Sequence, residues 1–308
     1  LGQRPVSAWA AMEGWQTLAV VHQTRGDLAA ALDARRSAVQ AARGAGLKTR
    51  EATLTINVGF ALTTVGAEAE ARAAIEAGIH LAQAIGSPGT ERHGKMILLC
   101  WAATFGSDAC FEALPAEPGA GADAAVTGSW VPPARATLGV LYYRGVELLR
   151  GDGDAEAARA LLRTAAQGYK ATKMLDVVPA ALGHWAEAEL RCGDAARARE
   201  LASEAAALLD EGHPSLLNEA PVYLALHNAN MDLGREDEGR AAIARGMPRL
   251  QHRLQALGGP RYVRGFLLQL ASNAAFLTVA QRYGLLPEAI VEALREAEAG
   301  SSDRLSTA

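Results

Sequence analysis

The chain has 308 residues, half of them hydrophobic and only 5% aromatic, and 30 basic against 34 acidic side chains give a net charge of −4. The absence of any lysine- or arginine-rich run argues against nucleic acid as a partner, because phosphate contacts need clustered positive charge. No apolar stretch reaches the roughly 18 residues of a membrane span, and no secretory signal is present, so we expect a cytoplasmic protein without membrane contact.

The sequence repeats at a spacing of about 40 residues, which is typical of helical-repeat proteins. In each repeat a glycine, usually followed by a charged residue, separates two apolar helical runs. Five residues after each glycine, six of the seven positions hold Ala or Gly. This shared register predicts a solenoid rather than two ordinary domains. The glycines are Gly26, Gly66, Gly106, Gly153, Gly193, Gly234 and Gly284.

Apolar residues spaced at i, i+3, i+4 and i+7 predict one helix on each side of these glycines. In the first pair, Trp15, Leu18, Ala19 and His22 share a face, and Gly44 ends the second helix. The predicted pairs are 7–25 with 28–44, 51–65 with 67–85, 92–105 with a shortened partner, 135–150 with 154–170, 177–192 with 194–210, 216–233 with 236–257, and 261–283 with 286–299.

One segment interrupts this pattern. Residues 114–134 are rich in Pro, Gly and Ala and cannot form a continuous helix. They are predicted to be either a long loop, with Trp130 docked back onto a repeat, or a hinge. The expected organisation is therefore repeats one to three over 1–113, this loop or hinge, repeats four to seven over 135–299, and a flexible tail over 300–308.

The first pair resembles a tetratricopeptide (TPR) repeat, whose pattern is W-x2-L-G-x2-Y, then G, then A-x3-F-x2-A. Arg35 departs from it, standing where the family prefers an aromatic residue. The resemblance recurs in weaker form along nearly the whole chain. It implies an all-α, right-handed superhelical solenoid of about seven TPR-like helix-turn-helix repeats. The matching residues are Trp15, Leu18, Ala19, His22, Gly26, Ala31 and Ala38.

A second resemblance comes from the long period and from residues 262–284. This segment is similar to the closing stretch of TPR tails in large bacterial regulators, which join a serine/threonine kinase or a STAND-type ATPase to such a tail. Arg264, Phe266, Leu267 and Asn273 are in matching positions, whereas Ala271-Ser272 replaces the expected Pro-Glu. Because residue 1 is a leucine, we expect a piece of a longer signalling protein, with its kinase or ATPase domain as one possible partner.

The chain has no recognisable catalytic or cofactor motif. Cys100, Cys110 and Cys192 form no CxxC pair, so neither a disulfide framework nor a zinc site is expected. The run from Arg150 to Asp154 starts like a calcium loop but lacks the later Glu, which favours a turn with an Asp cap. His22 and His227 are interpreted as packing residues. No cofactor or metal is predicted.

In TPR stacks the first helix of each pair lines a concave groove, so equivalent positions form ladders along it. The position six residues before each glycine is apolar in the first half of the chain and polar in the second, and the position ten before it is apolar from the second repeat to the third. The first ladder is Val20, Phe60, Cys100, Glu147, Glu187, Asn228 and Thr278, and the second is Gln16, Ile56, Met96, Tyr143, Gly183, Leu224 and Ala274.

These ladders predict a bipartite binding groove. Its apolar half would contain Ile56, Phe60, Met96, Cys100 and Tyr143. The alternative is that a tightly wound superhelix buries these residues against the loop that contains Trp130. The carboxylate clamp of chaperone-binding TPR domains is not expected, because it needs Lys and Asn in the ladders. The polar half would contain Glu147, Glu187 and Asn228, with Arg191 and Arg282 at its edge.

The sequence thus favours binding over catalysis. The leading hypothesis is a protein–protein interaction or sensor module that binds a peptide or protein segment in the groove. The alternative of the same class is a small-molecule sensor, in which a closed superhelix encloses the ligand. A remote alternative is a solenoid enzyme that uses Glu147 and Glu187 as paired carboxylates.

Overall fold

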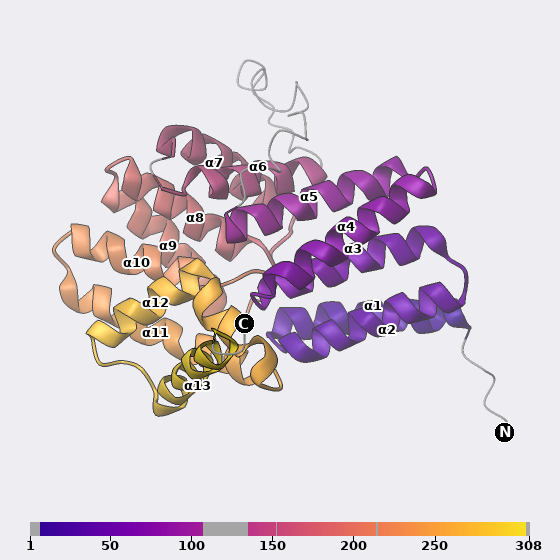
Figure 1. Cartoon of the computed structure of the whole chain (residues 1–308). Coiled ribbons are helices and arrows are strands. Elements are labelled where there is room, and N and C mark those ends of the chain that lie inside the picture. Colours follow the sequence, from indigo (N-terminus) through magenta and orange to yellow (C-terminus); the bar gives the residue numbers. More distant parts are fainter. Residues whose placement is uncertain (1–6, 107–134, 152, 214, 306–308) are drawn as a thin grey trace, which may run out of the picture.

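The computed structural model describes residues 7–106, 135–151, 153–213 and 215–305, and these ranges contain helices and no strand. Successive helices pack as neighbouring pairs, consistent with an α-solenoid (Figure 1). The all-α prediction is confirmed for this part of the chain. The predicted hinge or loop at 114–134, with Trp130, lies outside the described residues, as do Cys110 and the shortened partner of 92–105.

The predicted helix boundaries up to residue 257 agree with the observed ones within four residues at each end. The first helix pairs are α1 (Ala8–Arg25) with α2 (Leu28–Gly44) and α3 (Lys48–Thr64) with α4 (Glu68–Ala84), followed by α5 (Pro88–Phe105). The later helices are α6 (Arg135–Leu148), α7 (Ala155–Ala171), α8 (Val178–Arg191), α9 (Ala195–Asp210), α10 (Ala220–Asp232), α11 (Glu236–Gln255), α12 (Ala271–Arg282) and α13 (Glu288–Leu305).

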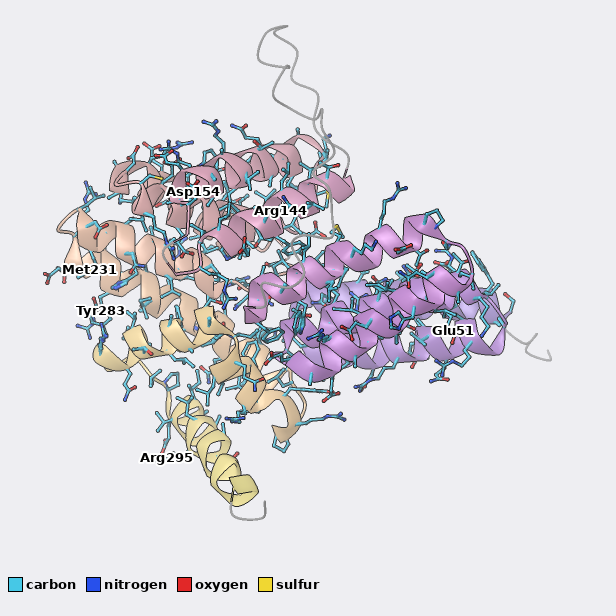
Figure 2. The ribbon with its side chains drawn as sticks, turned by 45° about the horizontal axis from the view of Figure 1, so that its top comes forward. Glu51, Arg144, Asp154, Met231, Tyr283 and Arg295 are labelled. Carbon is cyan, nitrogen blue, oxygen red and sulfur yellow. The ribbon has the colours of Figure 1, made fainter. Side chains whose placement is uncertain are left out.

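The repeated glycines end the first helix of each pair in the left-handed conformation, which glycine adopts without steric cost. The fourth pair differs from the prediction, because Gly151, with φ of 58°, and not Gly153 occupies this position. Asp154 instead caps α7, accepting a hydrogen bond of 2.9 Å from the Ala157 amide (Figure 2). The predicted Asp cap is confirmed. Positions in α6 are therefore counted from Gly151, two residues earlier than predicted.

Small side chains let the two helices of a pair approach closely. A Cβ placed on Gly59 of α3 would lie 2.4 Å from Ile75 of α4, and one on Gly78 of α4 would lie 2.5 Å from Ile56 of α3. At each glycine, an isoleucine of the other helix therefore occupies the space that a larger side chain would need. This interlocking brings the two helices of the pair close together without large aromatic side chains between them.

The last predicted pair is only partly correct. Residues 261–283 do not form one helix but a 3-10 turn (η2, Pro260–Tyr262), a π-helical turn (η3, Gly265–Gln269) and α12. The chain bends by 79° between these turns and α12, at Leu270. Asn273 stabilises the break, since its side-chain amide donates a 2.8 Å hydrogen bond to the Phe266 carbonyl. At the other end, α13 continues to Leu305, so the predicted flexible tail is helical to that residue.

No single described helix has the length and hydropathy of a membrane span. The bent pair Pro260–Gln269 and Ala271–Arg282 passes that test together, by length and composition only. Phe266 and Leu267 of this pair are buried in the protein core.

The two ends of the helical stack contact each other. The Ala29 amide donates a 3.0 Å hydrogen bond to the Ala256 carbonyl, and His252 Nε2 lies 3.0 Å from the Arg25 carbonyl. These contacts join residues about 227 positions apart in the sequence and close the stack on itself. Side chains reinforce the closure between Arg36 and Tyr262 and between Arg261 and Glu70.

Arg35, the residue that departs from the TPR pattern, is buried in the first pair, and no described group bonds its Nε. Burial lowers the pKa of Arg35 to about 10, so the charged form is destabilised at every pH below that value. We expect Arg35→Met, which keeps the aliphatic stem, to raise the free energy of unfolding by about 1–3 kcal/mol. Chemical denaturation at neutral pH measures this, and a destabilised variant would contradict it.

Candidate functional site

A cavity of about 590 Å³ lies between the first helices of several pairs, including α12, and the segment before α10. Its wall combines a tyrosine and histidine cluster, a set of small and branched apolar side chains, and a rim of polar groups. We refer to it as the central cavity. Its lining consists of Thr63, Thr64, Cys100, Ala103, Thr104, Tyr142, Tyr143, Val146, Leu149, Arg150, Gly151, His184, Glu187, Arg191, Leu217, Asn218, Pro221, Leu224, Ala225, Asn228, Leu270, Ala271, Ser272, Ala275 and Val279.

Closure of the stack completes this wall. Thr63 and Thr64 at the end of α3 face the cavity from the N-terminal side, and Leu217 and Asn218 face it from the segment before α10. Buried Gln23 joins the two sides, because its amide nitrogen lies 3.3 Å from both Thr64 Oγ1 and the Leu216 carbonyl oxygen. The cavity wall is therefore formed by parts of the chain that are distant in sequence.

Aromatic rings form the wall on the side of α6 and α8. The Tyr142 hydroxyl lies 3.0 Å from His184 Nδ1, and the two rings meet edge to face at 5.6 Å. Tyr143 packs against Tyr142 at 5.0 Å between ring centroids. Burial lowers the pKa of His184, against the opposing effects of Glu187 and the Ala180 carbonyl, which favours the neutral imidazole. This wall offers flat apolar surface with neutral hydrogen-bonding groups.

The thiol and phenol groups in the wall are poor acid–base catalysts. Burial raises the pKa of Cys100 to about 12, although Tyr143 and Thr104 hydrogen bond to it. Burial also raises the pKa of Tyr142 and of Tyr143 well above the ordinary tyrosine value. All three groups stay protonated at neutral pH, so Cys100 is not a thiolate nucleophile. The chemistry suited to them is hydrogen bonding to a ligand.

Charged side chains gather at one edge of the cavity. Glu187 and Arg191, one turn apart on α8, form an ion pair of 2.9 Å. Arg191 also donates to the Gly151 carbonyl at 3.0 Å, and Arg150 donates to the Ala103 carbonyl at 3.0 Å. The two guanidinium groups are thus anchored by backbone carbonyls of neighbouring helix pairs. This edge carries two positive charges and one negative charge.

A buried ion cluster holds the segment that carries Leu217 and Asn218. Glu219 accepts hydrogen bonds from Arg249 and from Arg253, the latter at 2.8 Å, and Arg253 also donates to the Ser215 carbonyl at 2.9 Å. Burial raises the pKa of Glu219, but the charges and hydrogen bonds of both arginines outweigh it and hold that pKa below the ordinary value. The carboxylate is therefore ionised and fixes this part of the cavity wall.

Asn218 links the same segment to α12. Its amide nitrogen donates 2.8 Å hydrogen bonds to Ser272 Oγ and to Asn273 Oδ1. Asn273 is fully buried and in turn bonds the Phe266 carbonyl. The polar groups at the break before α12 thus position the last part of the wall.

Five of the ten groove residues predicted from the sequence line the central cavity, namely Cys100, Tyr143, Glu187, Asn228 and Arg191. The other five lie elsewhere. Ile56 is fully buried in the core beneath Gly78, so its predicted place in the groove is corrected. Phe60 and Met96 are partly buried against the core, while Glu147 and Arg282 are outside the cavity lining.

The change of register explains the misplacement in α6. Counted from Gly151, Tyr142 takes the position that His184 takes before Gly193, nine residues earlier, and these two side chains are in contact. Glu147 moves off the groove for the same reason, so only Glu187 of the proposed carboxylate pair reaches the cavity.

Other wall residues were missed because the cavity begins nearer the turns than predicted. Thr64 and Thr104, which were missed, each stand two residues before a turn glycine, as does the predicted Arg191, and polar residues recur at this position in the sequence. That recurrence was a usable signal. No sequence signal identified Asn218 and Ser272, because their place in the cavity wall depends on the closure of the stack.

The described residues include no group of three or more His, Cys, Asp or Glu side chains placed to hold a metal ion. Cys100 and Cys192 are free thiols. His227 is a buried histidine, as predicted, and its Nδ1 lies 3.0 Å from the Gly239 carbonyl oxygen. Its ring meets that of Tyr283, which also contacts Met231 at the edge of the molecule (Figure 2).

Comparison of the sequence with models of known protein families finds no match, and comparison with curated proteins finds none either. The TPR resemblance therefore rests on the residues of this chain alone.

Proposed function

We propose that this chain is a binding module of TPR-like helix pairs, about seven in number and wound into a right-handed superhelix, whose central cavity binds a small molecule. The supporting observation is the cavity itself. Its volume of about 590 Å³ falls within the range of small-molecule sites, roughly 300–1,000 Å³. Apolar rings with a few convergent polar groups are the usual lining of such sites.

Closure of the stack favours a small molecule over a helix or a protein segment. The contacts of Ala29 with Ala256 and of Gln23 with Leu216 bring the two ends of the stack together beside the cavity. A helix with its side chains is about 10–12 Å wide and would have to separate these contacts. A flat molecule that stacks on Tyr142 or Tyr143 and hydrogen bonds to the neutral wall groups needs no such opening.

An extended peptide is the second candidate. The groove positions six residues before the turn glycines continue from Cys100 to Phe60 and Val20, and the Val20 side chain is exposed. A short extended segment would follow this row of apolar side chains out of the cavity. The partner would then be a protein or peptide, as the sequence first suggested.

Filling the cavity tests the proposal. Ala275 lines the cavity from an exposed position, so Ala275→Trp should occupy the ligand volume without disturbing the core. Metabolite fractions below about 1 kDa from the source cells should raise the Tm of the unmodified chain, because a ligand that binds only the folded state stabilises it. We expect Ala275→Trp to abolish this rise and to leave the ligand-free Tm within about 2 °C.

Ala289→Trp is the matched control, since Ala289 is exposed on α13 and lies outside the cavity lining. It should respond to the same fractions as the unmodified chain. Equal stabilisation of both tryptophan variants would place the ligand elsewhere and refute the cavity as the site. Stabilisation by peptide fractions alone would favour the second candidate.

We also propose that the module belongs to a bacterial signalling protein with a serine/threonine kinase or STAND-type ATPase domain. The support is the resemblance of residues 262–284. Ligand binding would then be sensed through the closure, because that segment contains Gly265, which touches Gly66. Ligand-dependent kinase or ATPase activity of the full polypeptide tests this, and activity indifferent to the ligand would contradict it.

A further inference from the structure

The first helix carries an apolar face that nothing in the described structure covers. Among the described residues, eight large hydrophobic side chains are exposed, and five of them belong to α1. Trp15, Leu18 and Val21 stand three residues apart and share one face of this helix, with 42%, 45% and 36% exposure. The adjoining side of α1, with Met12 and Ala19, is buried. We call the exposed set the α1 face.

In three of the later first helices the same positions are buried. Leu18 and Val21 lie eight and five residues before the turn glycine Gly26. The equivalent residues are at most 9% exposed in α3, α8 and α10. They are Val58 and Ala61 in α3, Trp185 and Ala188 in α8, and Leu226 and Ala229 in α10.

The register also indicates what covers these positions. Each of α3, α8 and α10 packs against the second helix of the preceding pair, namely α2, α7 and α9. Residues at positions eight and five before the glycine lie on the side of the helix away from its own partner, since position seven, Gly59 in α3, faces α4. The α1 face is therefore the surface with which a first helix receives a preceding second helix.

Among these contacts, that of α10 with α9 is the best model for the α1 face. Leu226 and Ala229 of α10 occupy the same positions as Leu18 and Val21, a leucine followed by a smaller residue. Tyr223, at the position of Trp15, packs instead against Gly246 of its own partner α11. The buried side of α9 consists mainly of alanine, which lets large side chains of a neighbour pack close to its backbone.

We propose that the α1 face is a stacking surface for another helix pair, whose alanine-rich second helix covers Leu18 and Val21 as α9 packs on α10. This surface is separate from the central cavity and does not depend on what the cavity binds. It would extend the stack beyond α1, which explains why five of the eight exposed large hydrophobic side chains among the described residues lie on this one helix.

A chimera tests the proposal with a helix pair of this chain. Residues 178–210, the pair α8–α9, are fused ahead of Ser7 through a Gly/Ser linker of about eight residues. Carbene labelling and mass spectrometry then measure the exposure of Leu18 and Val21. We expect labelling to fall roughly fourfold relative to the unfused chain, because Val21 is 36% exposed and the covered equivalents, such as Val58, are at most 9% exposed. The same fusion carrying Leu18→Glu and Val21→Glu should keep an exposed α1.

The outcomes separate the possible occupants. Protection in the fusion, lost in the double variant, supports the proposal. Unchanged labelling of α1 in the fusion overturns it. Sedimentation velocity of the unfused chain provides the second test. A dimer that Leu18→Glu and Val21→Glu convert to a monomer would also overturn it, because a second copy would then be the occupant. Both substitutions are at exposed positions, so a native circular dichroism spectrum is expected for every variant.

Discussion

Replacing Glu219 by Gln is expected to lower the free energy of unfolding by about 3–5 kcal/mol. The substitution keeps the shape of the side chain and removes only the charge that faces Arg249 and Arg253. Arg253 is itself buried, so the variant leaves an uncompensated cation inside the protein. Chemical denaturation measures the loss.

The matched control for this loss is Glu204→Gln. Glu204 also forms an ion pair, with Lys170, but both side chains are largely exposed. Exposed pairs contribute about 0–1 kcal/mol, so this variant should be close to the unmodified protein. Equal effects of the two substitutions would contradict the role assigned to the buried cluster.

The effect of Glu219→Gln on stability should depend on pH. The pKa of Glu219 is lower in the folded protein than its ordinary value, about 4.3. The ionised carboxylate therefore stabilises the fold fully above that value, and this contribution is lost as the pH falls through the folded-state pKa. The difference in stability between the unmodified protein and Glu219→Gln should be constant near neutral pH and should shrink below about pH 4.

Gly265→Ala is expected to open the contact between the ends of the stack and to cost about 1–3 kcal/mol. A Cβ at this position would lie 2.4 Å from the Gly66 carbonyl oxygen, and this neighbour is backbone that cannot rotate away. Gly265 does not have a positive φ, so alanine is acceptable for the backbone there and any loss comes from the collision. Hydrogen exchange of the Ala29 amide, which bonds the Ala256 carbonyl, should accelerate in the variant.

Gly89→Ala is the control for Gly265→Ala. A Cβ on Gly89, in the first turn of α5, meets nothing within 4 Å. Alanine is the better helix former, so this variant should be as stable as the unmodified chain or slightly more so. A Gly265→Ala protein with unchanged stability and a protected Ala29 amide would show that the two ends do not hold each other in the way described.

The helices could be predicted from the sequence because local signals specify them. Each turn glycine takes a left-handed conformation that other residues adopt at a cost, so its spacing marks the end of each first helix. The error at Gly153 has a local cause as well. Two glycines, Gly151 and Gly153, stand near the same turn, and spacing alone does not say which of them has the positive φ.

The cavity could be predicted only in part, because it depends on contacts between distant segments. Cys100, Glu187 and Asn228 followed from the repeat register. Asn218 and Ser272 did not, since they reach the cavity through the break before α12 and through the closure of the stack. No Gly or Pro stands at the break at Leu270, so the sequence gives no local sign of the break. Asn273, whose side chain stabilises the break, comes three residues after Leu270.

Native mass spectrometry of the purified chain, after incubation with extract from its source cells, is the most direct test of the central claim that the cavity holds a small molecule. We predict a mass gain of a few hundred daltons, the size that a cavity of about 590 Å³ admits, and its loss in Ala275→Trp. A gain of several kilodaltons, retained in that variant, would contradict the claim and would identify a peptide or protein bound outside the cavity.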